Sequence, residues 1–436
     1  MNLAGKYQLS VAGLTGLGLI ALVSVYTLYL MSRLAGFDGL SSVANDSVNY
    51  LAMARYYSPW VQSSDAIQSV WPLQDFPPLF PLLLAVSGTA HSLLYAHMLV
   101  VLIGLAALLP LYSYAAQVTG DRISALAATL LFIMLPGTLL ALQGILSESL
   151  YLLLSLMCLT GLLNINQPDW KKLFVLALLL ALAMLTRSVG AVLWIAVVVH
   201  MLINLLSKRE FNRYLLKIIV LAAGLYLTVD FYIGTERESH YYQGLLDFFA
   251  GRDSTEIAGS ANILYVQLMS LLDAWRSFLI LYWLDEITAG LVVSMLLLFM
   301  ALAVLVVRLK HNTIDAWYVL GMIVLLVIWP HPGQMVRLIF PLVPLLLVYA
   351  AAAIVWLVRR TRYYPRHVKV VVFLFILAAV LPSHFFIHGR LELAESQNMV
   401  PVYELFRKLD ISAAKRDLHV QNRMFLDLEV CLLYTS

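Results

Sequence analysis

Long apolar runs, separated by short clusters of charged residues, dominate the sequence from residue 11 to residue 387. A run of about 20 apolar residues can cross the hydrocarbon core of a bilayer as an α-helix. Only 12% of the 436 residues are charged, against about 25% in ordinary soluble domains. Such a chain cannot surround a soluble fold with a solvated exterior. The sequence therefore predicts an all-α fold, a polytopic transmembrane helical bundle.

We expect about eleven spans, each placed between the charge clusters that bound it. Residues 1–387 would then form one transmembrane domain. Residues 388–436 would form a short extracytoplasmic tail, which we expect to be truncated. The predicted spans are 11–31, 91–117, 123–144, 148–163, 173–186, 189–206, 217–234, 286–307, 316–330, 338–357 and 370–387.

The distribution of Lys and Arg predicts a cytoplasmic N-terminus and an outer C-terminus. Cytoplasmic loops retain positive charge, and this orientation places 15 of the 28 Lys and Arg residues in inner connections and seven in outer loops. The two longest connections, 32–90 and 235–285, then lie outside. Both are rich in aromatic residues, which favour the bilayer interface. We expect both loops to contain interfacial helices that cover a lipid-linked substrate.

Composition disfavours several classes of activity. A net charge of +3 is too small to indicate nucleic-acid binding. Two distant cysteines, Cys158 and Cys431, support neither a disulfide framework nor a thiolate metal cage. The sequence has no Walker loop, Gly-rich dinucleotide turn or His-Glu-x-x-His element. The inner connections are too short for a nucleotide-sugar domain, so any activated donor must arrive through the lipid.

The first outer loop offers a candidate catalytic acid. Asp46, Tyr50, Met53 and Ala54 share one face of a predicted helix, with the carboxylate one turn above the phenol. A carboxylate at the membrane surface can accept a proton from an attacking hydroxyl and act as a general base. Alternatively, Asp46 is simply the N-cap of an interfacial helix, where Asp is favoured. The two interpretations are compatible.

Two further motifs lie at outer turns. The segment from Phe76 to Pro81 has three prolines, which should prevent a regular helix there and direct the loop back into the membrane. Glu148, flanked by Ser147 and Ser149, opens the predicted span 148–163. It is either a site residue or a first-turn acid capped by Ser147. Its place on the same membrane face as Asp46 favours the site.

Two arginines are candidate phosphate ligands. Arg187 interrupts a long apolar segment at a predicted outer hairpin, and Arg337 follows His331 at the turn before the span 338–357. An Arg near the membrane is costly unless it binds an anion, and the planar guanidinium suits a lipid phosphate. The alternative is an Arg that reaches ordinary head groups. His331 alone is more typical of a solvated turn residue.

Taken in order, these motifs resemble the GT-C class of integral-membrane glycosyltransferases, which use polyprenyl-phosphate sugars. The chain looks most like the bacterial branch related to protein mannosyltransferases, aminoarabinose transferases and the lipopolysaccharide-core transferases called Rgt. The resemblance covers roughly residues 10–350. The matching elements are Asp46 with Tyr50, Phe76 to Pro81, Ser147 to Tyr151, Leu185 to Arg187, and Arg337 followed by Pro341 and Pro344.

The resemblance implies an inverting transferase of the bacterial inner membrane that modifies lipopolysaccharide or another envelope glycan on the periplasmic face. Asp46 would be the catalytic base, while Arg187 and Arg337 would hold the departing lipid phosphate. Tyr50, Glu148 and His331 would be further substrate contacts. The implied partners are a polyprenyl-phosphate-linked sugar, a glycan, lipid or protein acceptor, and membrane lipids.

One departure from the family concerns the acid. Family members typically carry Asp-Glu where this chain has Asp46-Ser47, so any role of a second carboxylate there, including help to a divalent metal, is left open. No cofactor is otherwise implied. The sequence also leaves open a transporter or flippase for lipid-linked saccharides, and a saccharide polymerase or ligase.

Overall fold

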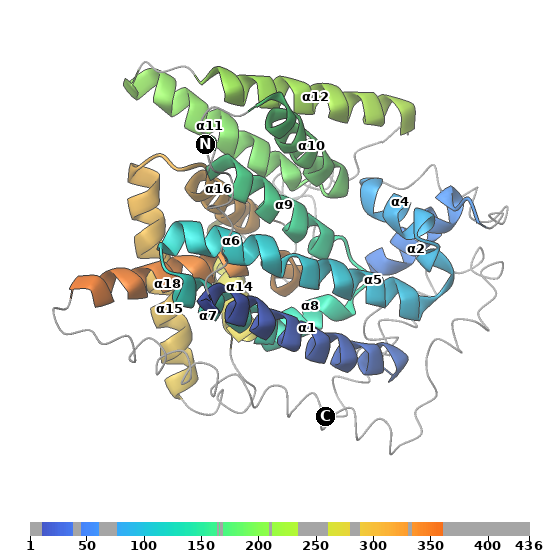
Figure 1. The fold of residues 1–436 in the computed structure, drawn as a ribbon, viewed down its shortest axis with the longest axis horizontal. Helices are drawn as coiled ribbons and strands as arrows, with labels where there is room; N and C mark the ends of the chain where they lie inside the picture. Colours follow the sequence, from blue (N-terminus) through green and yellow to red (C-terminus); the bar gives the residue numbers. More distant parts are fainter. Residues whose placement is uncertain are drawn as a thin grey trace.

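Helices account for nearly all of the residues that the structure, a computed structural model, describes, and no β-strand occurs among them (Figure 1). The predicted all-α fold is confirmed. The described residues are 11–37, 45–60, 76–163, 165, 169–208, 212–233, 260–279, 288–329 and 334–360.

Most of the helices follow one another along the chain with short connections. Their bounds are α1 (Val11–Phe37), α2 (Asn45–Tyr57), α4 (Leu79–Val86), the 3-10 turn η3 (Thr89–His91), α5 (Leu93–Ala106), α6 (Leu108–Thr119), α7 (Arg122–Met134), α8 (Pro136–Gln143), α9 (Glu148–Leu163), α10 (Trp170–Thr186), α11 (Gly190–Lys208), α12 (Arg213–Ile233), α14 (Ser260–Leu279), α15 (Thr288–Lys310), α16 (Ile314–Ile328), α17 (Met335–Leu338) and α18 (Val343–Arg360). The connections are longer in two places, where 21 residues separate α2 from α4 and 26 separate α12 from α14.

Six segments of the described chain are long and apolar enough to cross a membrane: α1, the α5–α6 pair, α11, α12, α15 and α18. The bent pair α7–α8 makes a seventh if it is counted as one span, and α9 and α16 are shorter apolar helices. The protein is thus a multi-pass membrane protein. The number eleven stays a prediction, and the predicted span 370–387 lies outside the described residues.

The predicted span 123–144 is not one continuous helix. It is divided into α7 and α8, whose axes differ by 59°. The break lies at Leu135, which has an extended backbone (φ −64°, ψ 138°), and Pro136 begins α8. Proline disfavours a helical conformation in the residue before it and is itself tolerated in a first helical turn. The sequence therefore carried the physical reason for the bend.

The prediction that the proline segment prevents a helix needs a similar correction. Helix α4 begins at Leu79, and Pro81 lies in its first turn. A proline there costs no intrahelical hydrogen bond, because the first N–H groups of a helix have no partner within it. Only Pro77 and Pro78 precede the helix. Phe80 and Pro81 are buried against the bundle, so the segment packs as a short helix.

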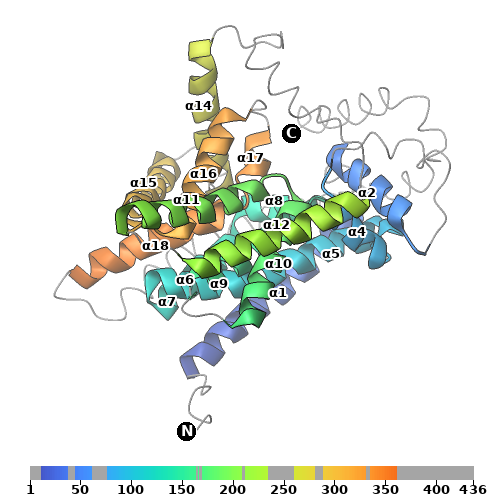
Figure 2. The same ribbon diagram turned by 90° about the horizontal axis from the view of Figure 1, so that it is seen from above.

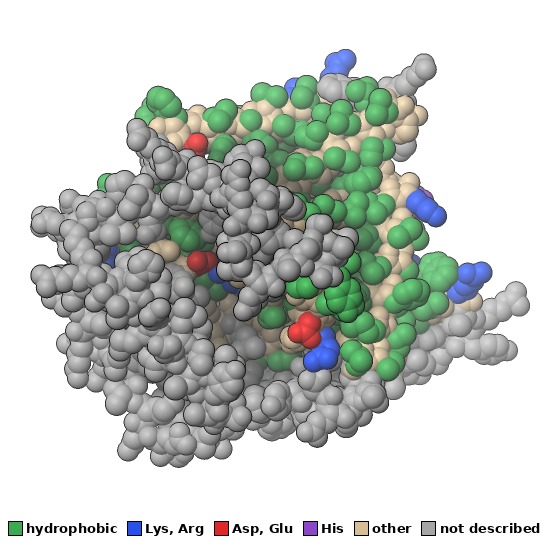
Figure 3. Space-filling view, turned by 180° about the vertical axis from the view of Figure 1, so that it is seen from behind, with side chains coloured by type: hydrophobic (Ala, Val, Ile, Leu, Met, Phe, Trp, Pro, Cys, Tyr) green, Lys and Arg blue, Asp and Glu red, His purple; other side chains and the backbone are tan. Residues whose placement is uncertain are grey.

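Large apolar side chains remain exposed on the outside of the bundle, as expected of a surface in contact with lipid. On α12, Leu227, Phe231 and Tyr232 are exposed. Figure 3 shows hydrophobic side chains covering most of the described surface seen from that side, with Lys and Arg mainly towards its edges. The bilayer, not water, is the solvent that suits this surface.

Helix α9 lies inside the bundle and brings the other elements together. It packs against α5, α6, α10 and α16, and most of its side chains are buried. Helices α2 and α4 lie side by side at one end of the molecule (Figure 2). The N-terminal end of α9 meets α2, because the hydroxyl groups of Tyr50 and Ser147 are 2.9 Å apart. This end of the bundle carries the candidate residues.

Two connections that the charge pattern assigns to the cytoplasm make polar contacts with neighbouring helices. Arg359 Nη2 donates to the Gly120 carbonyl at 3.1 Å, and His200 Nδ1 of α11 lies 2.5 Å from the carbonyl oxygen of Asn312. The N-in, C-out orientation itself stays a prediction that rests on the Lys and Arg count.

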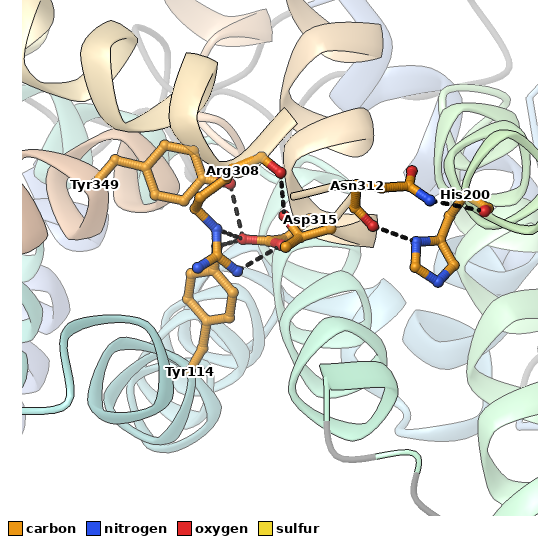
Figure 4. Close-up of polar contacts among 7 residues, drawn as sticks. Tyr114, His200, Arg308, Asn312, Asp315 and Tyr349 are labelled. Carbon is orange, nitrogen blue, oxygen red and sulfur yellow. Dashed lines mark hydrogen bonds and ion pairs between the residues drawn. The ribbon is translucent and has the colours of Figure 1, made fainter. Parts of the chain in front are cut away.

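A buried carboxylate joins four helices near these contacts. Asp315 is fully buried and accepts hydrogen bonds from Tyr114, Tyr349 and both Nε and Nη2 of Arg308, each at 2.8 Å. Figure 4 shows these side chains converging on Asp315. The Asn312–His200 contact adjoins them. The sequence interpretation treated Arg308 only as retained positive charge and missed Asp315.

Replacing Asp315 should destabilise the fold. Asp315→Asn leaves the guanidinium of Arg308 without its counterion, and breaking a buried ion pair in this way costs about 3–5 kcal/mol. We expect a clearly lower melting temperature for the purified protein in detergent. Asp273→Asn is the matched control, because its pair with Arg276 is long, at 3.6 Å, and exposed, and such pairs contribute about 1 kcal/mol or less. Equal melting temperatures for the two variants would contradict a stabilising role for Asp315.

Candidate functional site

Four charged side chains from distant parts of the sequence meet at one end of the bundle. Asp46 comes from the first turn of α2, and Glu148 is the first residue of α9. Arg187 ends α10, and Arg337 lies in the short helix α17. The sequence analysis named all four separately, from four outer segments. The structure joins them into one chain of ion pairs.

Glu148 is the centre of this chain. Its Oε1 lies 2.5 Å from Nη1 of Arg187 and also accepts from Nε of Arg337. The Glu148 side chain is only 3% exposed. A buried carboxylate is costly unless it is paired, and here two guanidinium groups share it. Among the described residues its second oxygen, Oε2, is buried and has no hydrogen-bond partner.

Asp46 forms the outer end of the chain. Its Oδ2 lies 2.5 Å from Nη1 of Arg337, and about a quarter of each side chain is exposed (26% and 23%). The helix begins one residue earlier, at Asn45, so Asp46 lies within the first turn, and its carboxylate is directed to Arg337. The sequence allowed Asp46 to be only an N-cap of its helix, but the structure also shows an ion pair with Arg337.

Tyr50 is connected to the arginines through a serine. Its hydroxyl lies 2.9 Å from Ser147 Oγ, and Arg187 Nη1 donates to the same oxygen at 3.2 Å. Burial raises the pKa of Tyr50 to about 12, so the phenol is neutral at physiological pH. Its ring packs edge-on against Phe76 and Phe80, with both ring centroids at 5.0 Å. The proline segment therefore positions Tyr50.

Ser147 is a site member that the sequence analysis did not select. It was considered only as a helix cap for Glu148. Its carbonyl does accept from the Tyr151 amide, but its fully buried hydroxyl joins Tyr50 to Arg187. The available signal was its position directly before Glu148 at the predicted outer face.

A tight hairpin between α10 and α11 fixes Arg187. The Arg187 amide donates to the Ala183 carbonyl at 3.1 Å, and the Gly190 amide donates back to the Arg187 carbonyl at 2.8 Å. A Cβ atom on Gly190 would lie 2.7 Å from backbone atoms of Ala183. Only glycine permits this approach of the two helix ends. The hairpin therefore holds the backbone of Arg187 in a fixed position.

Arg337 is fixed by the packing of α17. Met335 and Leu338 are buried, and the following ring of Phe340 packs against Phe132 and Phe278, with centroids at 5.7 and 6.2 Å. Helix α18 begins at Val343, five residues after the predicted start at 338, because α17 and a short turn intervene. Arg337 therefore lies in a short helix that precedes the apolar helix α18.

The residues predicted to share a helical face with Asp46 do pack together on the inner side of α2. Tyr50, Met53 and Ala54 are all buried. Both predicted outer loops contain helices, which are α2 and α4 in the first and α14 in the second. The position of these helices at the bilayer interface stays a prediction.

The two arginines are held as cations. Burial would lower the pKa of Arg187, but the Glu148 charge outweighs it and raises that pKa above its usual value. The same opposition raises the pKa of Arg337, where both Glu148 and Asp46 favour the charged form. With two carboxylates and two guanidinium groups, the cluster is balanced in charge.

A small cleft, with a cavity volume of about 10 Å³ and mostly apolar walls, lies beside the buried ion pair. Glu148 and Arg187 lie at its polar part, together with Tyr151, whose hydroxyl is 3.0 Å from that of Tyr318. The remaining wall comes from α16, α17 and neighbouring turns. Its apolar members include Val189, Met322, Leu325, Leu326, Leu338 and Pro341.

The donor set does not suit a divalent metal. The described residues contain no group of three or more His, Cys, Asp or Glu side chains placed to bind an ion. Asp46 and Glu148 are the two carboxylates of the cluster, but both contact the guanidinium of Arg337, which supplies the positive charge there. His331 lies outside the described residues, as does the tail 388–436.

Comparison with known protein families identifies one match. Residues 75–232 match the model of the dolichyl-phosphate-mannose-protein mannosyltransferase family. This segment includes Glu148, Arg187 and the whole proline segment from Phe76 to Pro81. The predicted resemblance to GT-C membrane glycosyltransferases is thereby confirmed. No curated protein sequence matches the chain.

Solved structures of low sequence identity are also similar. ArnT from Cupriavidus metallidurans bound to undecaprenyl phosphate is 15% identical, with a TM-score of 0.48 over 88% of this chain and 73% of ArnT. The apo oligosaccharyltransferase of Archaeoglobus fulgidus is 14% identical, with a TM-score of 0.49 over 92% of this chain and 57% of that one. The oligosaccharyltransferase AglB from Archaeoglobus fulgidus, in complex with an inhibitory peptide and a dolichol-phosphate, is 13% identical, with a TM-score of 0.48 over 88% and 56%. The chain spans little more than half the length of these oligosaccharyltransferases.

Proposed function

We propose that this chain, part of which matches a mannosyltransferase family, is a membrane glycosyltransferase that uses a polyprenyl-phosphate sugar. It transfers the sugar to an acceptor hydroxyl on the extracytoplasmic face of the membrane. One observation carries the proposal: Arg187 and Arg337 share a buried carboxylate beside an apolar cleft, with the accessible acid Asp46 on the second arginine.

The donor fits this combination of charge and apolar surface. Guanidinium groups bind phosphate oxygens with paired hydrogen bonds, and Arg187 is the cation that lines the cleft. The cleft itself is too small to hold an isoprenoid tail, which would instead extend over the exposed apolar surface of the bundle. The family matched by residues 75–232 is described by a dolichyl-phosphate sugar donor, which has the same polar and apolar parts.

The reaction is a displacement at the anomeric carbon with inversion. The acceptor hydroxyl loses its proton to Asp46, and its oxygen forms the new bond to the sugar. The bond from the anomeric carbon to the phosphate oxygen breaks, and polyprenyl phosphate leaves with the electron pair. Arg187 and Arg337 stabilise the negative charge that develops on the phosphate. A phosphate is a good leaving group, so no general acid is required.

Other residues of the cluster position these groups. Glu148 orients both arginines, while Tyr50 and Ser147 connect Arg187 to the helix that carries Asp46. Preorganised donors are effective because they need no reorientation as charge develops. His331 stays a predicted substrate contact in the same outer segment as Arg337.

The location follows from the donor and the predicted orientation. We place the protein in the bacterial inner membrane with the reaction on the periplasmic side, where no nucleotide sugar is available and a lipid-linked donor is needed. The acceptor would be a glycan, lipid or protein of the cell envelope, so the enzyme would modify lipopolysaccharide or a related glycan.

A transfer assay tests the proposal. Purified protein in liposomes is supplied with polyprenyl-phosphate sugars and a cell-envelope extract, and both transferred sugar and free polyprenyl phosphate are measured. We expect the two products in equal amounts, and none from nucleotide sugars. Movement of the intact lipid-linked sugar between leaflets without release of polyprenyl phosphate would instead identify a flippase. Transfer of preassembled saccharide chains would identify a polymerase or ligase.

A further inference from the structure

The two ion pairs of the candidate site differ in how accessible they are. Glu148 and Arg187 are 3% and 13% exposed, whereas Asp46 and Arg337 are 26% and 23% exposed. A buried pair is costly to separate because its charges have little access to water, but an exposed pair is weak. An anion that enters the site can therefore replace Asp46 on Arg337 more readily than it can replace Glu148 on Arg187.

Arg337 uses different nitrogen atoms for its two carboxylates. Nε donates to Glu148, and Nη1 lies against Asp46. If Asp46 moves away, Glu148 still anchors the guanidinium in place. The freed edge of Arg337 then faces an incoming phosphate with its planar donors already oriented.

The charge balance of the cluster indicates that one carboxylate must move away when the donor phosphate binds. Two carboxylates and two guanidinium groups balance, and a sugar phosphodiester adds a third anion. Like charges that are brought together repel strongly where water is excluded. Of the two carboxylates, Asp46 is the more exposed and contacts only one of the two arginines. It is the group with the lowest cost of displacement.

On this basis, and resting on the proposed function, we propose that Asp46 and the donor phosphate compete for Arg337. Arrival of the phosphate releases Asp46 from the guanidinium and turns the acid towards the acceptor hydroxyl. The base is therefore set free only in the donor complex. This makes the reaction ordered, with the donor bound before the acceptor.

During the reaction, one negative charge moves from Asp46 to the phosphate, and both groups lie beside Arg337. When the acceptor proton passes to Asp46 and the bond to phosphate breaks, one negative charge is lost from the carboxylate and one is gained by the phosphate. The total charge of the site is unchanged. Arg337 is placed beside both groups, so its interaction with the phosphate strengthens as the transition state forms, which is the condition for catalysis by differential binding.

The test is a double-mutant cycle on the affinity for polyprenyl phosphate, measured with purified protein in detergent. The variants are Asp46→Asn, Arg337→Gln and the combination of both, with Asp46→Ala as a second substitution because Asn retains a hydrogen-bond acceptor. We expect removal of Asp46 to tighten the binding of polyprenyl phosphate about three- to tenfold. This is the change in affinity expected when one partly exposed ion pair no longer competes with the phosphate. In the Arg337→Gln background the same change should have almost no effect.

Two results would overturn the competition. One is unchanged or weaker binding when Asp46 is removed. The other is an equal tightening with and without Arg337, which would indicate general repulsion between Asp46 and the phosphate. Both results presuppose that the wild type binds polyprenyl phosphate better than the uncharged polyprenol. Loss of that preference would instead contradict the proposed function.

Discussion

Asp46→Asn should nearly abolish sugar transfer while the protein still inserts, folds and binds polyprenyl phosphate. The substitution keeps the size of the side chain and removes the proton acceptor. General-base catalysis contributes about 10²- to 10⁴-fold to rate, so we expect turnover to fall about a thousandfold. The measurement is release of polyprenyl phosphate from a labelled donor in the presence of acceptor.

Asp273→Asn is the control for this result. Asp273 lies on α14, its side chain is 65% exposed, and its contact with Arg276 is long. Its replacement should leave turnover close to that of the wild type. If Asp46→Asn released polyprenyl phosphate as fast as the wild type, Asp46 would have no part in proton transfer.

Arg187→Ala should also lower turnover strongly, by about 10²- to 10³-fold, which is the effect of removing one preorganised donor from an oxyanion site. The loss has two causes. The leaving phosphate loses a guanidinium, and Glu148 loses the partner at 2.5 Å that shares its buried charge with Arg337. Polyprenyl phosphate should bind more weakly as well, because Arg187 lines the apolar cleft.

Two further variants separate charge from geometry. Arg187→Lys keeps the charge but replaces the planar guanidinium, which can bind a phosphate with paired hydrogen bonds, by a single ammonium, so it should recover only part of the activity. Arg213→Ala removes an exposed arginine at the start of α12 and should leave turnover unchanged. Activity of Arg187→Ala within about twofold of the wild type would exclude Arg187 as a phosphate ligand, given the effect expected for such a donor.

Much of the site could be predicted from the sequence because the membrane limits where charge is tolerated. An acid or arginine beside a long apolar run has few structural reasons to exist, and this argument selected Asp46, Glu148, Arg187 and Arg337. The positive-inside pattern then assigned all four to one face. The structure brings them together, as that assignment requires.

The pairing of these residues could not be predicted in the same way. More than 100 residues separate Asp46 from Glu148, and spacing over such a distance does not determine which atoms meet. That Glu148 bridges both arginines depends on the hairpin at Gly190 and on the helical turn of α17, which are tertiary features. Ser147 was missed because a serine before a helix has a sufficient explanation as a cap.

The arginine–aspartate cluster of Figure 4 was missed for a related reason. Arg308 fitted the pattern of retained cytoplasmic charge, and that pattern does not indicate a partner for it. Asp315 lies seven residues further on, across the tight turn that contains Asn312 with φ at 51°. Charge patterning locates such residues relative to the membrane, but it does not reveal whether they are exposed or buried in the bundle.

We propose that the cluster of Glu148, Arg187 and Arg337 binds a lipid-linked phosphate. The most direct measurement compares the affinity of the purified protein for polyprenyl phosphate and for the matching uncharged polyprenol. We expect the phosphate to bind at least about tenfold more tightly, the equivalent of about 1.4 kcal/mol, and Arg187→Ala to remove most of this difference. Equal affinity of the wild-type protein for the two lipids would contradict the account.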